Sequence, residues 1–388
     1  MPPTATARIH FLDSIRGLAA TTVFLSHLAG GYPLAVLESV GDTPLRILWH
    51  GEGAVSLFFV LSGLVLSLQF FKQESFPGSF SIVRYGIARL FRIMPLFWAV
   101  VWLSYAGYLY CFNPAPASLP ASDWLKGFWG EEKTFGSTLL ECLLVLKIPL
   151  QAHHRLVPQD WTLAVELVQS VALPFLVMLA RYRLGWMVFF VVFGAKLLGL
   201  PVFTFSFMLG VVLARYAGTI GNRWGGLPLA AKVLTLAAAV LLYGNAFLLP
   251  EPFTRVAGKF LIDLTALGSG LFLVMGLGSN TLQALLNRRP LLFIGKVSYG
   301  IYLTHMLLLL CLTPYALRFL NTLGVYDPYL LFAGGAAVTF AATVLLSFVT
   351  YHAVERPGIR LGKWFLDWAT LLFGSRPLRE PEARHVRA

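Results

Sequence analysis

The 388-residue chain is 57% hydrophobic and only 12% charged, and its mean hydropathy is +0.72. These values exclude a soluble globular domain of this length and indicate a polytopic membrane protein. The formal net charge of +12 comes with no basic soluble segment larger than a short loop or the tail, which argues against a nucleic-acid-binding protein.

Apolar windows long enough to cross a hydrocarbon core of about 30 Å recur along the whole chain. We expect ten, near residues 11–31, 53–71, 93–112, 161–180, 186–200, 202–217, 229–249, 259–279, 291–313 and 329–350. Only Pro201 separates the fifth window from the sixth, and both are short. A further apolar stretch at 137–150 suits a re-entrant or interfacial helix. The sequence therefore predicts an all-α integral membrane protein, a bundle of about ten transmembrane helices.

Basic residues orient this bundle. They gather in the segments 72–92, Arg181 to Arg183, Arg288 to Arg289 and from Arg356 to the tail. The positive-inside rule makes these segments cytoplasmic, together with the amino and carboxyl termini. We expect a single transmembrane domain over residues 1–360 and a cytoplasmic polar tail over residues 361–388.

Cysteine and loop histidine residues give no metal-binding pattern. Cys111, Cys142 and Cys311 are far apart and form no CxxC pair, so neither a disulfide framework nor a metal site is predicted. His50 lies beside Glu52 in an expected external loop, where a solvated histidine is the simplest interpretation.

The first apolar window carries two ionisable residues on one face. Arg16 and His27 are eleven residues apart, about three helical turns, so their side chains lie roughly 16 Å apart along the axis. Asp13, three residues before Arg16, joins that face. Because an ionisable residue in lipid costs about 2.5 kcal/mol or more, the arrangement favours a functional site. The alternative is that Arg16 extends to the lipid boundary and His27 is a packing residue.

Two further charged motifs border the third and fourth windows. In RLFRIMP, Arg89 and Arg92 project from neighbouring positions if the segment is helical, and two such guanidinium groups can bind phosphate groups bidentately. The alternative is that they bind no ligand and only keep this loop on the cytoplasmic side of the membrane. In DWTLAVEL, Glu166 lies about a turn and a half inside the boundary, where a carboxylate needs a cation, a proton or a polar cavity. Trp161 in the same motif is explained more simply as an interfacial anchor.

Polar residues also mark the last two windows. SYGIYLTH places Ser298, Tyr302 and His305 on one helical stripe, which suits a hydrogen-bonded packing seam as well as a catalytic wall. After the tenth window, Glu355 has the geometry to pair with a nearby arginine as structure only. Pro357 is expected to end that helix.

Taken together, these motifs resemble the membrane-bound acyltransferase 3 family. The motifs, in family order, are DSIRGLA followed by His27, FFVLSG, RLFRIMP, WTLAVE, SYGIYLTH and the closing Glu355-Arg356-Pro357. They cover about residues 8–360, nearly the whole chain. Each motif is weak alone, but six at sensible spacing are specific.

The resemblance implies a ten-helix membrane enzyme that O-acylates carbohydrates or related hydroxyl acceptors, commonly with acetyl-CoA as donor. The family's arginine and histidine, separated by ten residues, fall on Arg16 and His27, and its paired arginines fall on Arg89 and Arg92. The chain resembles stand-alone members without a fused extracytoplasmic hydrolase-like domain, which act directly on the acceptor or through a separate partner transferase. The bacterial inner membrane is the expected location, and a homo-oligomer is compatible with the family.

This resemblance suggests a mechanism. Arg89 and Arg92 would hold the phosphates of acyl-CoA, the cosubstrate, with no permanently bound cofactor. His27 would act as general base or transient acyl carrier, and Arg16 would stabilise an oxyanion or a phosphate. Either Asp13 or Glu166 is expected to orient the imidazole. The supporting residues are expected to be Trp161, Ser298, Tyr302, His305 and Glu355.

One function from another class remains open at this point. A proton-coupled secondary transporter also keeps ionisable residues within its helices, as a proton relay or a substrate site; here these would be Asp13, Arg16, His27 and Glu166. The sequence shows neither inverted repeats nor matched broken helices, which makes acyl transfer the better supported prediction.

Overall fold

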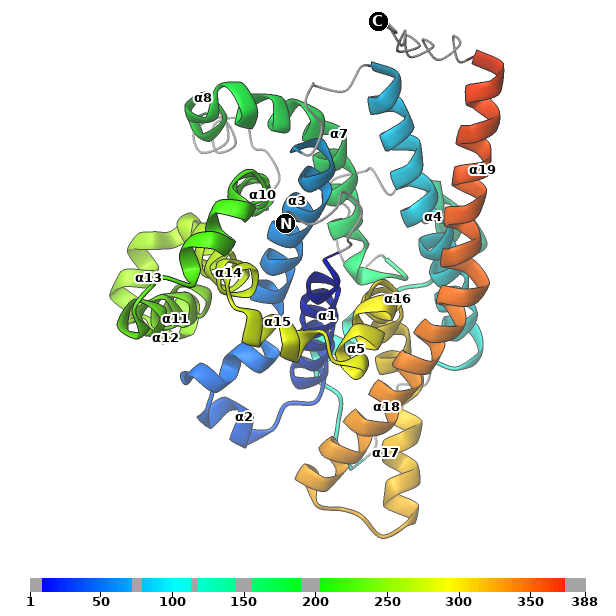
Figure 1. Ribbon diagram of the computed structural model, residues 1–388. Helices are drawn as coiled ribbons and strands as arrows, with labels where there is room; N and C mark the ends of the chain where they lie inside the picture. Colours follow the sequence, from blue (N-terminus) through cyan, green and yellow to red (C-terminus); the bar gives the residue numbers. More distant parts are fainter. Residues whose placement is uncertain (1–8, 72–78, 113–117, 144–154, 190–202, 374–388) are drawn as a thin grey trace, which may run out of the picture.

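The computed structural model describes residues 9–71, 79–112, 118–143, 155–189 and 203–373. Every regular element in these ranges is a helix, which confirms the all-α class (Figure 1). The long helices are α1 (His10–Gly31), α3 (Gly51–Phe71), α4 (Ser79–Tyr110), α7 (Trp161–Tyr182), α10 (Thr204–Trp224), α11 (Leu229–Tyr243), α14 (Leu261–Gly278), α16 (Arg289–Cys311), α18 (Pro328–Thr350) and α19 (Arg356–Phe373). The shorter helices are α2 (Ala35–Ser39), α5 (Asp123–Gly127), α6 (Phe135–Leu143), α8 (Leu184–Phe189), α12 (Asn245–Leu248), α13 (Glu251–Ala257), α15 (Asn280–Leu286) and α17 (Thr313–Thr322).

Seven segments in the described part of the chain are long and apolar enough to cross a membrane, which indicates a multi-pass membrane protein. They are Gly51–Phe71, Ile82–Tyr110, Pro158–Tyr182, Thr204–Trp224, Leu261–Gly278, Arg289–Cys311 and Pro328–Thr370. The window expected at 186–200 lies mostly outside the described residues. The count of ten helices and the cytoplasmic position of the termini therefore stay predictions.

The window expected at 229–249 is not one helix. The helix α11 ends at Tyr243 after 15 residues, and the chain turns at Gly244. The amide of Asn245 donates to the carbonyls of Leu242 and Leu261, at 2.6 and 3.1 Å, and thereby ties this turn to α14. Because the Asn245 amide supplies a donor to these two backbone carbonyls, an apolar sequence can change direction here.

The helix α4 begins much earlier than the window at 93–112 predicts. It starts at Ser79 and runs for 32 residues, so Arg89 and Arg92 lie inside a continuous helix instead of in a loop. Their side chains consequently project from a rigid element, one turn apart.

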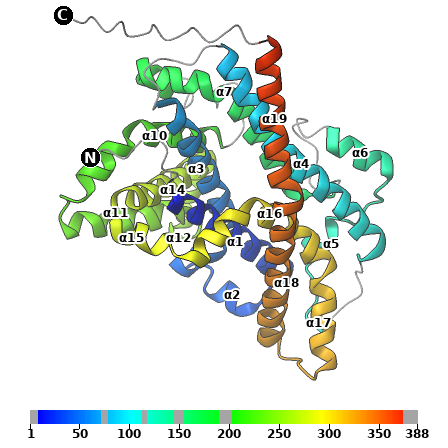
Figure 2. The ribbon, with the colours of Figure 1, turned by 45° about the vertical axis from the view of Figure 1, so that its right-hand side comes forward.

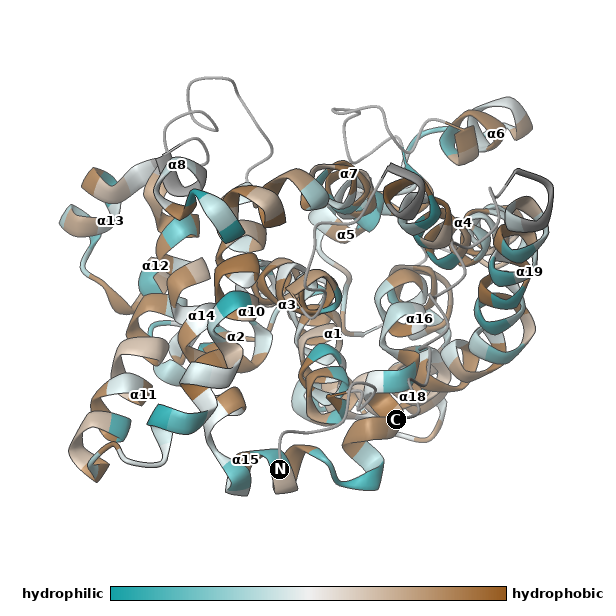
Figure 3. Ribbon diagram, turned by 45° about the horizontal axis from the view of Figure 1, so that its top comes forward, coloured by the Kyte–Doolittle hydropathy of each residue, from teal (hydrophilic) through white to brown (hydrophobic). Residues whose placement is uncertain are grey.

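Glycines allow α1 to occupy the middle of the bundle, between α3 and α16 (Figure 3). A Cβ atom on Gly17 would lie only 2.6 Å from the backbone nitrogen of Gly295, so the backbones of α1 and α16 are in direct contact. This close approach continues toward the far ends of both helices, where His27 and His305 lie.

We expect the replacement Gly17→Ala to destabilise the fold. The added methyl group must push α16 away, and overpacking of this kind typically costs about 1–3 kcal/mol. The measurement is the midpoint of thermal unfolding of the purified protein in detergent. The matched control is Gly218→Ala on α10, where an added Cβ meets nothing within 4 Å; equal midpoints for the two variants would contradict the close α1–α16 contact.

The last window continues past its expected end. The helix α18 passes through a π-helical turn at Tyr351–Glu355 into α19, which reaches Phe373 and lies along α4 (Figure 2). Pro357 does not end the helix, because the wider π-helical turn directly before it accommodates a residue that lacks an N–H donor. Residues 361–373, expected in a polar tail, are thus helical, and residues 374–388 lie outside the described part.

Candidate active site

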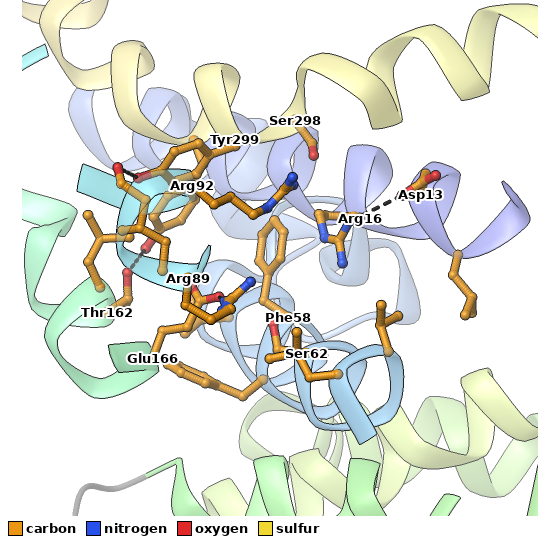
Figure 4. Close-up of a pocket in the computed structure, with 18 of the residues that line it drawn as sticks. Asp13, Arg16, Phe58, Ser62, Arg89, Arg92, Thr162, Glu166, Ser298 and Tyr299 are labelled. Atoms are coloured by element: carbon orange, nitrogen blue, oxygen red, sulfur yellow. Dashed lines mark hydrogen bonds and ion pairs between the residues drawn. The ribbon is translucent and has the colours of Figure 1, made fainter. Parts of the chain in front are cut away.

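A cavity of about 670 Å³ lies between α1, α3, α4, α7 and α16 (Figure 4). One face of α3 lines it from Val55 to Gln69, a span of roughly 21 Å along the helix axis at about 1.5 Å per residue. The cavity thus extends along α3 for about four helical turns. Its size is typical of a site for a small molecule or cofactor.

Charged side chains gather where α1 begins, and we call this the arginine end of the cavity. Asp13, Arg16, Arg89, Arg92 and Glu166 all line it. Three guanidinium groups face two carboxylates there, so the lining carries an excess of positive charge. An anionic ligand suits such a surface.

The three arginines differ in how firmly they are paired. Arg16 donates to Asp13 at 3.2 Å, and Arg89 forms a close ion pair with Glu166. The side chains of Arg16 and Arg89 are 20% and 12% exposed. Arg92 is 40% exposed, and its partner Glu355 is 3.8 Å away. Arg92 is therefore the arginine with most freedom to bind a ligand.

The ion partner of Arg92 comes from the π-helical turn. Glu355 is only 2% exposed, and one of its carboxylate oxygens has no hydrogen-bond partner. This agrees with the sequence-based expectation that Glu355 pairs with an arginine. Glu355 itself is not among the residues that line the cavity.

His27 pairs with His305. His27 Nδ1 and His305 Nε2 are 2.7 Å apart, and the two rings are nearly coplanar, with an interplanar angle of 7°. His305 Nδ1 lies 3.1 Å from the carbonyl oxygen of Ile301, which only accepts, so His305 carries its proton on Nδ1. His305 Nε2 is then an acceptor, and His27 Nδ1 donates to it. This leaves a lone pair on His27 Nε2, the atom that a general base needs.

His27 does not line the cavity that contains Arg16. Phe58 and Tyr302 do line it, and their ring centroids are 5.6 Å apart. The Tyr302 ring is in turn 6.1 Å from the ring of His305. Ring contacts from Phe58 through Tyr302 to His305 thus connect the lining of the cavity to the histidine pair.

Asp13 and Glu166, the two expected orienters of His27, pair with arginines in this structure. Asp13 binds Arg16 and Glu166 binds Arg89, and all four residues line the cavity together with Arg92. The residue bonded to His27 Nδ1 is His305. Helical spacing shows which residues share a face, but it does not show which carboxylate approaches a given imidazole ring.

The remaining predicted residues are spread over the site. Ser298 lines the cavity and donates to the carbonyl of Gly295 at 2.9 Å. Trp161 does not line it; its ring is 5.7 Å from that of Phe203, and the residue is 39% exposed, as expected for an anchor. His50 is not solvated: it is 8% exposed, and burial lowers its pKa to about 4, with a smaller effect from the charge of Arg46.

A polar strap, residues 155–160, holds the outer part of the site. Gln159 donates to the carbonyls of Tyr302 and Leu303 at 3.0 and 2.7 Å, one turn before His305. The carboxylate of Glu141 accepts from the backbone nitrogens at 156 and 157, at 2.9 and 3.0 Å, and burial raises its pKa to about 7. These bonds fix the strap against α16.

Sequence reasoning missed several residues at the site. Phe58 and Thr162 line the cavity, and Trp124 lies over His27 with ring centroids 5.7 Å apart. Phe58 belongs to FFVLSG, one of the motifs that carry the family resemblance, but the sequence alone indicates no role for this residue. Trp124 follows a loop without periodicity, so no sequence signal places it next to His27. Among the described residues, no three His, Cys, Asp or Glu side chains gather as metal ligands would.

Comparisons with known proteins agree on one chemistry. The model of the acyltransferase domain of the acyltransferase 3 type matches residues 9–352. Acyltransferase MdmB from Streptomyces mycarofaciens is 27% identical to this chain, over 93% of this chain and 94% of its own length. No solved structure matches the chain.

Proposed function

The chain belongs to the acyltransferase 3 family, and on this premise we propose that it moves an acyl group, acetyl in the simplest case, from acyl-CoA to a hydroxyl of a carbohydrate or glycosylated acceptor. We further propose that it does so in the plasma membrane, with the arginine end of the cavity on the cytoplasmic side. Acyl-CoA is cytoplasmic, and the basic loops favour this orientation.

The arginine end suits the donor. Acyl-CoA carries its phosphates at one end and the thioester at the other, joined by a narrow pantetheine arm. Arg92, with Arg16 and Arg89 beside it, offers charge-assisted hydrogen bonds to phosphate oxygens. The same cavity is also lined by apolar side chains such as Leu66, Ile93 and Leu163, which suit the arm.

His27 suits the transfer step. His27 Nε2 accepts the proton of the acceptor hydroxyl as its oxygen attacks the thioester carbon, which forms a tetrahedral oxyanion. Collapse of that intermediate breaks the C–S bond, and the leaving thiolate takes the proton from His27. The products are the O-acyl ester and free CoA. His305 acts as a positioning residue, because it holds the proton of His27 on Nδ1.

One observation carries this proposal: α1 carries Arg16 in a cavity lined by three arginines and, about three turns further on, His27, whose Nε2 keeps a lone pair because its Nδ1 is bonded to His305. An elongated donor with a charged head and a reactive tail fits that arrangement.

The proposal is tested with purified protein, acetyl-CoA labelled in its acetyl group and a glycan extract of the bacterial envelope. We expect label in the glycan fraction and an equal amount of free CoA, and neither without protein. Glycan-dependent label without CoA release, or no release at all from folded protein, would contradict acyl transfer from acyl-CoA.

Arg92→Ala should weaken the use of the donor specifically. Loss of one charge-assisted hydrogen bond costs about 1.5–3 kcal/mol, so we expect KM for acyl-CoA to rise about 10- to 100-fold with little change in KM for the acceptor. The measurement is steady-state kinetics with each substrate varied in turn.

The matched control for this prediction is Arg84→Ala. Arg84 lies on the same helix, is also 40% exposed and pairs with Asp367 at 2.8 Å, but it does not line the cavity. An equal rise in KM for acyl-CoA in both variants would show that loss of a positive charge on α4, and not loss of a contact between Arg92 and the donor, causes the effect.

A further inference from the structure

We propose that the outer surface of the bundle binds an anionic phospholipid where α16 lies beside the end of α18. The two helices pack side by side, and α18 continues into the π-helical turn at Tyr351–Glu355 (Figure 2). Four residues form the site, which we call the basic seam: Lys296, Tyr351, His352 and Arg356. Tyr351 is partly exposed and the other three are exposed. None of the four lines the cavity, so the seam is independent of the proposed donor site.

Lys296 is an exposed cation on a helix that is long and apolar enough to cross the membrane. It lies seven residues after Arg289, the first residue of α16, which is about 10 Å along the axis. Its ammonium nitrogen is 4.8 Å from the centroid of the Tyr351 ring, so the side chain is directed toward the π-helical turn. Lys296 forms no ion pair with another described residue. A lysine on the outer face of a spanning helix is costly unless an anion accompanies it.

The other polar groups of the seam are also hydrogen-bond donors. In the described part of the chain, the Tyr351 hydroxyl, the His352 ring and the Arg356 guanidinium have no hydrogen-bond partner. Glu355, which lies between these residues in the sequence, is buried and faces Arg92, so its carboxylate points into the protein. The groups that face outward are therefore donors, and two of them are permanent cations. Phosphate oxygens are the acceptors that suit such a surface.

Aromatic rings beside these donors favour a phospholipid over a free phosphate ion. Phe293 on α16 and Phe348 on α18 are both exposed, and their ring centroids are 6.0 Å apart. The Phe348 ring is 4.6 Å from that of His352, and the His352 ring is 5.1 Å from that of Tyr351. Apolar rings thus adjoin the donors on one surface. A ligand with a phosphate group and acyl chains contacts both parts, whereas inorganic phosphate contacts only the donors.

The experiment measures binding of tritium-labelled dioleoyl phosphatidylglycerol to the immobilised full-length protein in detergent, by scintillation proximity. Unlabelled phosphatidylglycerol should displace the label at a concentration about tenfold or more below that of phosphatidylcholine with the same chains, and excess inorganic phosphate should not displace it. Lys296→Gln should raise Kd for phosphatidylglycerol about fivefold or more, and Lys296→Arg should keep it within about twofold. Arg356→Gln, which leaves α16 unchanged, should raise Kd in the same direction.

The matched control is Lys232→Gln, which removes the same charge from α11 and should keep the wild-type Kd. Equal displacement by the two lipids would overturn the proposal, as would a wild-type Kd in both Lys296→Gln and Arg356→Gln. Displacement by inorganic phosphate as effective as that by phosphatidylglycerol would assign the seam to a free phosphate ion and not to a lipid.

Discussion

His27→Ala should abolish nearly all acyl transfer while leaving the protein folded and able to bind its donor. General acid–base catalysis by one positioned side chain typically contributes 10²–10⁴-fold, so we expect kcat to fall by about that factor. The arginines proposed to bind the donor line the cavity and His27 does not, so KM for acyl-CoA should change little. The measurement is kcat and KM with saturating acceptor.

His10→Ala is the matched control, since His10 is an exposed histidine at the start of the same helix. It should retain the wild-type kcat. If a folded His27→Ala variant kept the wild-type rate, the free Nε2 of His27 would not be the catalytic base.

The second large effect concerns the ion pair between Arg89 and Glu166. Their side chains are 12% and 25% exposed, so Glu166→Gln leaves a largely buried guanidinium without its counter-charge. Breaking a buried ion pair in this way costs about 3–5 kcal/mol, and the water-accessible cavity beside Glu166 places the expected loss at the lower end. The measurement is the thermal unfolding midpoint in detergent.

A double variant, Arg89→Met with Glu166→Gln, tests the reason for that loss. Removing both charges eliminates the unpaired guanidinium, so the double variant should recover much of the stability that Glu166→Gln alone loses. If the stability lost in the double variant equalled the sum of the losses in Arg89→Met and Glu166→Gln, the ion pair would not be the source of the effect.

The sequence predicts the local part of this site well, because helical spacing fixes which residues share a face. Arg16 and His27 do lie on one helix, three turns apart, and Arg89 and Arg92 project together from α4. Spacing alone does not predict what each side chain meets. His305 is 278 residues from His27 in the sequence, and only the direct contact between α1 and α16 brings the two rings together.

The places where the fold differs from the sequence-based expectation also depend on contacts that helical spacing does not show. An apolar window does not reveal that Asn245 turns the chain between α11 and α14, because one of the carbonyls that its amide binds, that of Leu261, belongs to the next long helix. Pro357 usually ends a helix, but here the π-helical turn at Tyr351–Glu355 lets α19 continue. Such features depend on neighbouring hydrogen bonds, which composition and periodicity do not encode.

The most direct test of the account is an experimental structure with a bound non-transferable analogue of acetyl-CoA. The proposed function predicts phosphate oxygens within hydrogen-bond distance of Arg92 and the thioester carbon within reach of a hydroxyl group bound at His27 Nε2. An analogue bound outside this cavity, or bound with its acyl end at Arg92, would contradict it.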